Sequence, residues 1–198
     1  MNVNFWGAVN TAEAFQSQLL EHKSRLIVIG SDCADYPLPG FAIYSASKAA
    51  LQSWATALRL EVGKYGVTVV TFQPGSFPLQ SRLLFGLTKQ FAGMKAKLEQ
   101  KNLAEFYGST LEQFSKHFSS LFNEVTPPIA PLDNDCLRKA LLSVLEDDMS
   151  KTPVYIYESA GQAIFHMMIS TLPRWISDAL ILKVLNSPKW KREENKIK

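Results

Sequence analysis

Tyr44-Ser45-Ala46-Ser47-Lys48 is the stretch of this 198-residue chain that decides its fold and its chemistry. On a helix, residues i and i+4 share one face, so the Tyr44 phenol and the Lys48 ammonium point into the same space. A free phenol has a pKa near ~10 and exchanges protons poorly at neutral pH. A neighbouring ammonium favours the phenolate and lowers that pKa, which makes the tyrosine usable as a general acid or base. Such a pair also occurs on ordinary solvent-exposed helix faces, so its surroundings must decide between the two interpretations.

The residues before this pair predict a ligand-binding sheet edge. The run Leu26–Gly30 is short, continuous and rich in β-branched residues, which is typical of a strand buried on both faces of a parallel sheet. Ser31 follows this strand directly and lies 13 residues before Tyr44. It therefore stands at the carboxyl end of the strand, where open α/β sheets bind their ligands. Asn4 lies another 27 residues upstream.

The residues after the pair predict a second strand at the same edge. Val67–Phe72 is again a continuous β-branched run, and it leads through Gln73 into Pro74-Gly75. The intervening residues, from Tyr44 to about Val62, have the apolar spacing of one long helix that packs on a sheet.

Asn4, Ser31, Tyr44 and Lys48 together resemble the catalytic tetrad of the short-chain dehydrogenase/reductase family, in residue type and in spacing. The surrounding sequences VNFWG, YSASKAA, LRLEVGKYGV and QPGSF are most similar to the membrane-associated branch that contains retinol and 17β-hydroxysteroid dehydrogenases. The resemblance covers about residues 2–79 and continues more loosely to the C-terminus.

The resemblance implies an oxidoreductase that interconverts an alcohol and a carbonyl on a lipophilic substrate, either a retinoid or a steroid. In that reaction Tyr44 would exchange a proton with the substrate oxygen, and Lys48 would lower the pKa of Tyr44. Ser31 would hydrogen-bond the substrate oxygen and stabilise developing charge. Asn4 would help to hold a water molecule in a proton relay behind Lys48.

The resemblance also implies NAD or NADP as cofactor. Tyr44 and Lys48 would contact the nicotinamide ribose, and Pro74 and Gly75 would lie against the nicotinamide. The glycine-rich turn that receives the pyrophosphate in this family is absent, because none of the ten glycines forms a G-x-x-x-G-x-G or G-x-G-x-x-G pattern. Gly30 occupies a position that is serine in many relatives, and we expect that difference to matter little.

The expected fold is the C-terminal part of a Rossmann-type doubly wound parallel sheet, with about three strands and flanking helices in a single partial domain, residues 1–198. The strands are expected at Arg25–Ile29, Val67–Phe72 and Pro153–Tyr157, and helices at about 3–20, Tyr44–Val62 and 133–145. The chain resembles an N-terminally incomplete dehydrogenase. We therefore expect an open strand edge that makes the isolated chain marginally stable or a homo-oligomer. The alternative function is a catalytically incomplete fragment or isoform that binds no dinucleotide and acts through protein or membrane contacts.

Two further segments bear on the substrate and the location. Residues 76–123 are expected to be a helical, aromatic-rich insertion that covers the substrate in the family. Residues 161–185 are expected to form a broken pair of apolar helices, because Pro173, Arg174 and Asp178 interrupt the apolar run. These helices pack on the core, form a dimer contact or lie in a membrane interface. The resemblance favours association with the endoplasmic reticulum or mitochondrial membrane, with the cytoplasm as the alternative.

Composition excludes several other classes of protein. The formal charge of +3 comes entirely from residues 189–198, so the body is near neutral and lacks the basic face of a nucleic-acid binder. Two cysteines, Cys33 and Cys136, form neither a disulfide framework nor a metal-binding spacing. The three histidines are widely separated, so we expect no metal, and Ser31 has no evident histidine partner for hydrolase chemistry.

Overall fold

The computed structural model describes residues 1–75, 77, 87–122, 135–146, 153–157 and 159–184. The described residues fall into two compact units, each of which we describe by itself. The larger unit comprises residues 1–77 and 132–177 and contains the sheet. The smaller unit comprises residues 78–131 and 178–198. The start of the expected 76–123 insertion and the basic tail at 189–198 lie outside the described residues.

The sheet of the larger unit has three parallel strands in the order β1-β2-β3, as the sequence predicts. Strand β1 is Arg25–Ile29, β2 is Thr68–Pro74 and β3 is Val154–Ile156. The register pairs Ile27 with Val70 and Phe72 with Val154. Strand β2 lies in the centre and is buried over most of its length. Strand β1 has no second strand partner within the described residues.

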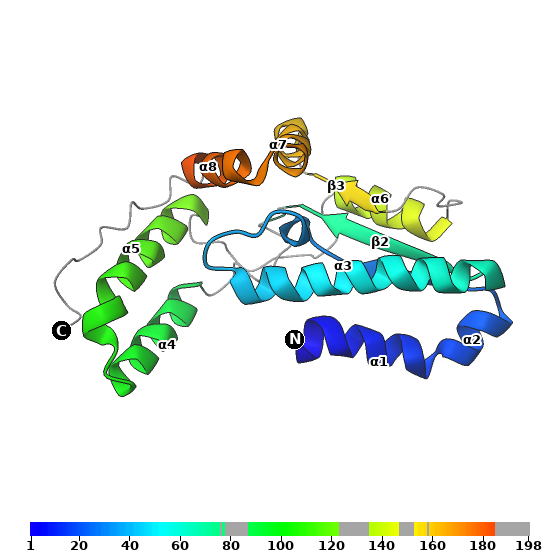
Figure 1. The fold of residues 1–198 in the computed structure, drawn as a ribbon, viewed down its shortest axis with the longest axis horizontal. Coiled ribbons are helices and arrows are strands. Elements are labelled where there is room, and N and C mark those ends of the chain that lie inside the picture. Colours follow the sequence, from blue (N-terminus) through cyan, green and yellow to red (C-terminus); the bar gives the residue numbers. More distant parts are fainter. Residues whose placement is uncertain (76, 78–86, 123–134, 147–152, 158, 185–198) are drawn as a thin grey trace. The chain divides into compact units, whose positions relative to one another are not determined.

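Helices cover both faces of this sheet (Figure 1). Side chains alternate between the two faces of a strand, so neighbouring residues of β1 and β2 enter different cores. Val28 and Val69 pack with Leu51 and Ala55 of α3 (Ala42–Val62). Val70 and Phe72 pack on the opposite face with Val144 of α6 (Asp135–Glu146). The arrangement confirms the predicted α/β class.

The first predicted helix is divided in the structure. The chain begins with a π-helical turn, Asn2–Trp6, and continues as α1 (Gly7–Ala14) and α2 (Gln16–Glu21), which separate at Phe15. The long helix α3 ends where the sequence predicts, since Gly63 opens a single 3₁₀ turn and Gly66 adopts a φ of 84°. That positive φ favours glycine, which has no Cβ to clash with the backbone.

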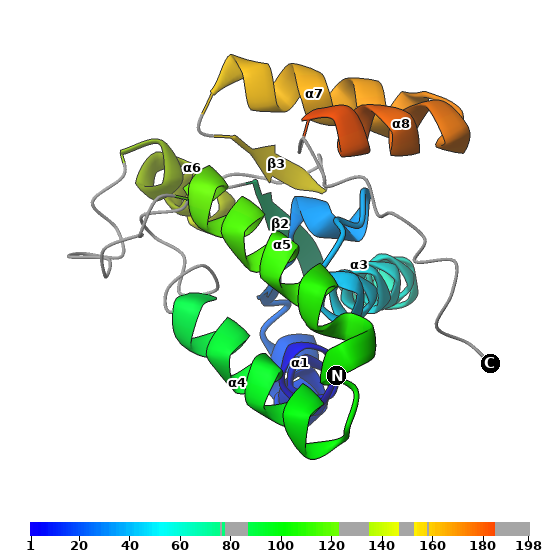
Figure 2. The ribbon, with the colours of Figure 1, turned by 90° about the vertical axis from the view of Figure 1, so that its left-hand side faces the viewer.

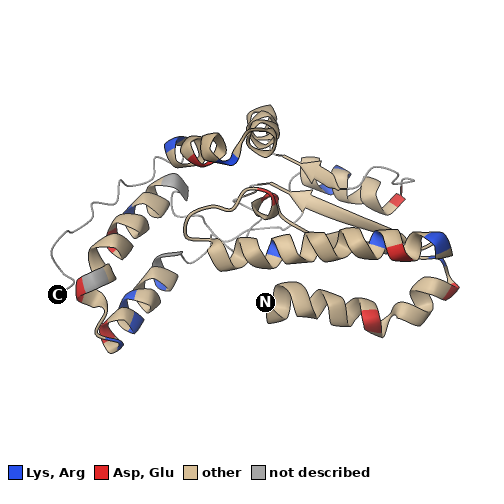
Figure 3. Ribbon diagram, in the orientation of Figure 1, with Lys and Arg blue, Asp and Glu red and all other residues tan. Residues whose placement is uncertain are grey.

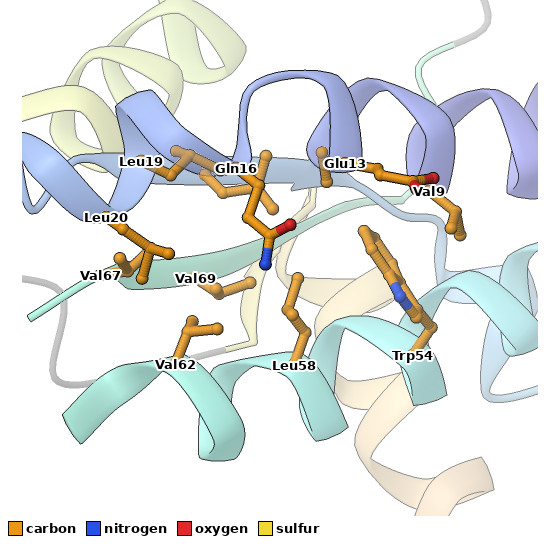
Figure 4. A pocket seen from close by; sticks show the side chains of 12 residues that line it. Val9, Glu13, Gln16, Leu19, Leu20, Trp54, Leu58, Val62, Val67 and Val69 are labelled. Carbon is orange, nitrogen blue, oxygen red and sulfur yellow. The ribbon is translucent and has the colours of Figure 1, made fainter. Parts of the chain in front are cut away.

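An apolar hollow of about 250 Å³ lies between α1, α2 and α3 over the first residues of β1 and β2 (Figure 4). Trp54 of α3 and Gln16 of α2 border it, and its lining is almost entirely apolar. Because Leu26, Val67 and Val69 form its floor, the hollow lies over the amino-terminal parts of the strands. Ser31 follows the opposite, carboxyl end of β1, so the hollow is separate from the predicted chemistry.

The C-terminal helices also match the predicted division. Helix α7 (Ala160–Thr171) and helix α8 (Arg174–Val184) are separated by Leu172 and Pro173. The Ser177 hydroxyl, 2% exposed, donates to the Ile169 carbonyl at 2.9 Å and fixes the start of α8 against α7. In the described part of the chain, every helix is too short or too polar to cross a bilayer.

The smaller unit contains α4 (Leu87–Gln100) and α5 (Ala104–Phe122), which pack side by side (Figure 2). Phe91 lies 6.4 Å from both Phe114 and Phe118, measured between ring centroids, and the last two rings stack at 4.6 Å. Lysines and acidic residues are mixed on these two helices (Figure 3). The pair is therefore held together by its aromatic stripe.

Candidate active site

Helix α3 brings the Tyr44–Lys48 pair to the carboxyl end of β1. The Lys48 ammonium donates to the Ile29 carbonyl, the last residue of β1, with an Nζ–O distance of 2.8 Å. Ser31 lies two residues further along, on the extended turn that follows the strand. Ser31, Tyr44 and Lys48 therefore meet at the sheet edge that the sequence indicated.

Tyr44 lies half-buried beside both partners. Its ring centroid is 6.0 Å from the Lys48 Nζ and 6.3 Å from the ring of Phe41. Burial raises the pKa of Tyr44, the Ser31 hydroxyl lowers it, and the nearby Cys33 and Asp32 raise it again. The net direction is upward, so the expectation of a lowered pKa is wrong for this state of the chain. The physical reason is that the ammonium bonds a backbone carbonyl while the phenol loses solvation.

Lys48 also responds to burial, which lowers its pKa from the ordinary value. An ammonium has three N–H donors. One reaches the Ile29 carbonyl, and the other two have no hydrogen-bond partner among the described residues. Those two donors suit a pair of sugar hydroxyls, so the residue present at this position fits the ribose of a nicotinamide nucleotide.

Ser31 is 7% exposed and is surrounded by polar atoms of its own turn. Its hydroxyl donates to Asp32 Oδ1 at 3.2 Å and accepts from the Cys33 backbone N–H at 3.2 Å. The second bond caps the short 3₁₀ turn Asp32–Ala34. The hydrogen bond from the Cys33 N–H therefore fixes the position of the hydroxyl oxygen, and only the direction of its O–H bond can vary.

Asn4 lies on the π-helical turn Asn2–Trp6 and hydrogen-bonds to helix α3, which carries Tyr44 and Lys48. Its Nδ2 donates to Ser47 Oγ at 3.1 Å, and Ser47 Oγ donates to the Tyr44 carbonyl at 2.7 Å. Ser47 is 1% exposed, so this link ties the first turn of the chain to α3. The structure thus brings Asn4 next to the Tyr44–Lys48 helix turn, while its predicted water relay remains a prediction.

Pro74 and Gly75 end β2 at the same edge. The Gly75 N–H donates to the Ile156 carbonyl at 2.8 Å, and a Cβ on Gly75 would lie 2.9 Å from Cδ1 of Tyr157. Only glycine allows the backbone and this ring to approach so closely. The close packing of Tyr157 therefore requires glycine at position 75, and the contact of Pro74 and Gly75 with a nicotinamide stays a prediction.

The sequence reasoning missed a polar network that adjoins the site. Asp35 accepts from Gln52 Nε2 at 2.9 Å and from the Tyr155 hydroxyl at 2.8 Å, and its Oδ2 lies 3.0 Å from His166 Nε2. The Tyr36 hydroxyl donates to Asp32 Oδ2. The sequence offered one signal, the two aspartates Asp32 and Asp35 within four residues after the strand-end serine Ser31. Two of the partners of Asp35, Tyr155 and His166, lie 120 and 131 residues away along the chain, so no local pattern could reveal them.

The Cys33 thiol lies two residues beyond Ser31. Cys33 is half-buried, and burial raises the pKa of its thiol to about 12, with the Asp32 charge adding to the effect. Among the described residues, no group of three or more His, Cys, Asp or Glu side chains is arranged to hold a metal ion.

Comparison with known proteins agrees with this geometry. The family model described as short chain dehydrogenase matches residues 1–82, which include Asn4, Ser31, Tyr44, Lys48 and the Pro74-Gly75 turn. Estradiol 17-beta-dehydrogenase 2 of Mus musculus is 43% identical over 184 residues, which is 92% of this chain. The chain belongs to the short-chain dehydrogenase family.

Two further relatives place the chain in the hydroxysteroid dehydrogenase-like branch. Estradiol 17-beta-dehydrogenase 2 of Rattus norvegicus is 27% identical over 79% of this chain, and 11-beta-hydroxysteroid dehydrogenase type 2 of Oryctolagus cuniculus is 28% identical over 72%. The chain spans less than half of the length of each of these relatives. It covers 46% of the mouse protein, 39% of the rat protein and 35% of the rabbit protein.

Proposed function

We propose that the chain carries the catalytic and nicotinamide-facing part of a dehydrogenase that interconverts an alcohol and a carbonyl on a steroid-like substrate. The observation that supports this proposal most directly is the convergence of Ser31, Tyr44 and Lys48 at the carboxyl end of β1, fixed by the 2.8 Å bond from Lys48 to Ile29. The steroid class rests on the names of the relatives, two of which act on estradiol. A retinoid is the alternative substrate of the same lipophilic kind.

In the proposed reaction Tyr44 gives a proton to the carbonyl oxygen during reduction and takes it back from the alcohol during oxidation. Ser31 hydrogen-bonds the same oxygen and fixes its position. A bound NAD or NADP supplies or accepts the hydride. Lys48 holds the nicotinamide ribose through its two remaining donors, and Asn4 anchors the helix turn that carries Tyr44 and Lys48.

Only one end of the dinucleotide finds matching residues in this chain. Lys48, Pro74 and Gly75 suit the nicotinamide ribose and ring, whereas the glycine-rich pyrophosphate turn is absent from the sequence. That absence supports the alternative function, a catalytically incomplete isoform without dinucleotide binding. The two functions differ in whether the polypeptide, alone or with the sequence that completes the sheet, binds a dinucleotide.

Titration calorimetry with NADH and NADPH separates these functions. We expect weak, saturable binding to the 198-residue chain and tighter binding to a version extended by the missing nucleotide-binding half of a relative. In that extended protein, Tyr44→Phe is expected to reduce turnover by about 10²-fold or more while changing dinucleotide affinity little. If neither protein binds NADH or NADPH, the dehydrogenase proposal is rejected and the alternative, a non-catalytic isoform, is supported.

We also propose that α7 contacts a membrane interface. Ile164, Met167 and Met168 of this helix are 55%, 61% and 45% exposed, which is unusual for a cluster of large apolar side chains. Flotation with anionic liposomes should carry the wild-type chain and leave a Met167→Glu variant behind. Ile43→Glu is the matched control, because Ile43 is 76% exposed on α3 and lies outside this cluster. Equal flotation of both variants would oppose this contact, and a wild-type chain that stays at the bottom would favour the cytoplasmic alternative.

A further inference from the structure

The apolar hollow between α1, α2 and α3 is left unfilled by the core beside it. Leu19, Leu58 and Val62 pack against the buried cluster that contains Val67 and Val69, yet each of these three side chains stays partly uncovered. All five residues line the hollow, which has a volume of about 250 Å³. Apolar atoms that border an empty space lack the contacts that a neighbour would give them. A molecule that occupies the hollow therefore gains both apolar burial and dispersion contacts.

The volume of the hollow sets the size of its occupant. An engineered apolar cavity of about 150 Å³ binds one molecule of benzene. At the same occupancy, the 250 Å³ of this hollow accommodates about ten carbon atoms, the size of two fused six-membered rings. The indole of Trp54 borders the space and gives such a ring system an aromatic neighbour (Figure 4). A four-ring steroid or a long acyl chain is too large for it.

Two polar side chains stand at the mouth of the hollow. Glu13 of α1 and Gln16 of α2 are exposed, whereas the floor residues Val67 and Val69 are only 4% and 2% exposed. Figure 4 shows the Gln16 side chain extending from α2 toward Leu58 of α3. The Gln16 amide forms no side-chain hydrogen bond with the other described residues. Its N–H groups and its oxygen are therefore available to a polar group on an occupant.

The charge at the mouth selects against anions. Glu13 is the only charged side chain among the described residues that line the hollow, and it forms no ion pair with any of the described residues. A carboxylate on the occupant would lie close to the Glu13 carboxylate and be repelled by it. A neutral hydroxyl or amide can instead donate a hydrogen bond to Glu13 and accept one from Gln16.

We propose that this hollow is a separate binding site for a neutral molecule with an apolar body of about ten carbon atoms and a single hydroxyl or amide group. The apolar body fills the hollow, and the polar group lies at the mouth between Glu13 and Gln16. The site is distinct from the candidate active site. Leu26, which lies on the floor, precedes Ser31 by five residues, about 16 Å along an extended strand. The proposal therefore does not depend on the proposed function.

Titration calorimetry of the 198-residue chain with 2-naphthamide and 2-naphthoate tests the charge requirement. The two probes share the same fused rings and have nearly the same shape, but only 2-naphthoate is negatively charged at pH 7. We expect 2-naphthamide to bind at one site with a Kd on the order of 0.1 mM, and 2-naphthoate to bind about tenfold more weakly or less well still. Glu13→Gln should reduce this difference to about threefold or less, because it removes the repelling charge. Equal binding of the two probes to the wild-type chain, or no binding of 2-naphthamide, would overturn the proposal.

Two substitutions on α3 test the location of the site. Val62→Phe places a ring in the hollow and should weaken the binding of 2-naphthamide by about tenfold or more, because the ring takes the space of the probe. Leu60→Phe is the matched control, since Leu60 is 70% exposed and lies outside the hollow. Its affinity for 2-naphthamide should stay within about twofold of wild type. Equal affinities of the two variants would place the probe elsewhere and refute the proposal.

Two further measurements keep the test decisive. If circular dichroism shows that Val62→Phe does not fold, the comparison of the two probes on wild type and Glu13→Gln decides alone. The titration is also repeated at a higher protein concentration, with light scattering to follow association. An affinity for 2-naphthamide that is unchanged by association supports the proposal. Binding that is lost as the chain associates would mean that a second copy covers the hollow, which contradicts the proposal.

Discussion

Replacement of Gly30 by alanine would force a side chain into the space of Gln73. A Cβ on Gly30 would lie 1.9 Å from Oε1 and 2.6 Å from Cδ of Gln73, far inside the approach of any real Cβ. Gln73 is fully buried, so its amide cannot swing into solvent. Overpacking of this kind costs about 1–3 kcal/mol, and the reduced freedom of the unfolded chain returns about 0.4–1 kcal/mol. We therefore expect Gly30→Ala to lower the free energy of unfolding by about 1–2 kcal/mol.

A double-mutant cycle isolates the contact from everything else that the two substitutions do. In a Gln73→Ala background the obstructing amide is absent. Gly30→Ala should then be neutral or stabilising by a few tenths of a kcal/mol, because only its effect on the freedom of the unfolded chain remains. Urea unfolding of the four proteins, followed by tryptophan fluorescence, gives the coupling energy, which we expect to be about 2 kcal/mol. Gly63→Ala is the control, because a Cβ there meets no atom within 4 Å. An equal cost of Gly30→Ala in both backgrounds would refute this reasoning.

The remaining predictions concern thiol reactivity, the Asp35 network and association. At pH 8 a disulfide reagent should modify the exposed Cys136 quickly and Cys33 slowly, because burial raises the pKa of Cys33 to about 12. Rapid modification of the remaining Cys33 in a Cys136→Ser variant would contradict this. His166→Ala should cost about 1–3 kcal/mol of unfolding free energy, measured in urea, since Asp35 loses a buried partner; a loss below about 0.5 kcal/mol would count against the network. Light scattering should find the isolated chain associated, because β1 pairs on one side only within the described residues and Ile29 at its end is 48% exposed; a monomer of ordinary stability would disprove this.

The sequence was sufficient for the features that depend on local spacing. The β-branched run before Ser31 predicted β1, the i to i+4 spacing predicted that Tyr44 and Lys48 share a helix face, and Pro173 predicted the break between α7 and α8. The resemblance added the family, which the comparisons confirm. Each of the three structural predictions depends only on residues that are neighbours in the sequence.

The sequence was insufficient where a property depends on residues that meet only in the fold. The raised pKa of Tyr44 follows from burial and from Asp32, neither of which the Tyr-x-x-x-Lys spacing contains. Glycine in place of serine at position 30 was expected to matter little, but Gln73, 43 residues away, fills the space that any Cβ would need. The break at Phe15 was also missed, because the apolar spacing of residues 3–20 reads as one continuous helix.

Asp35 has a consequence for the order in which the molecule assembles. Its three partners come from α3, β3 and α7, and two of them lie 120 and 131 residues away along the chain. Contacts across such long loops carry a large closure entropy and form slowly. The pairing of β1 with β2 across α3 needs far shorter loops and should come first. The hydrogen bonds around Asp35 should therefore form last when the larger unit folds. When they break, α7 should be the first segment that a protease releases.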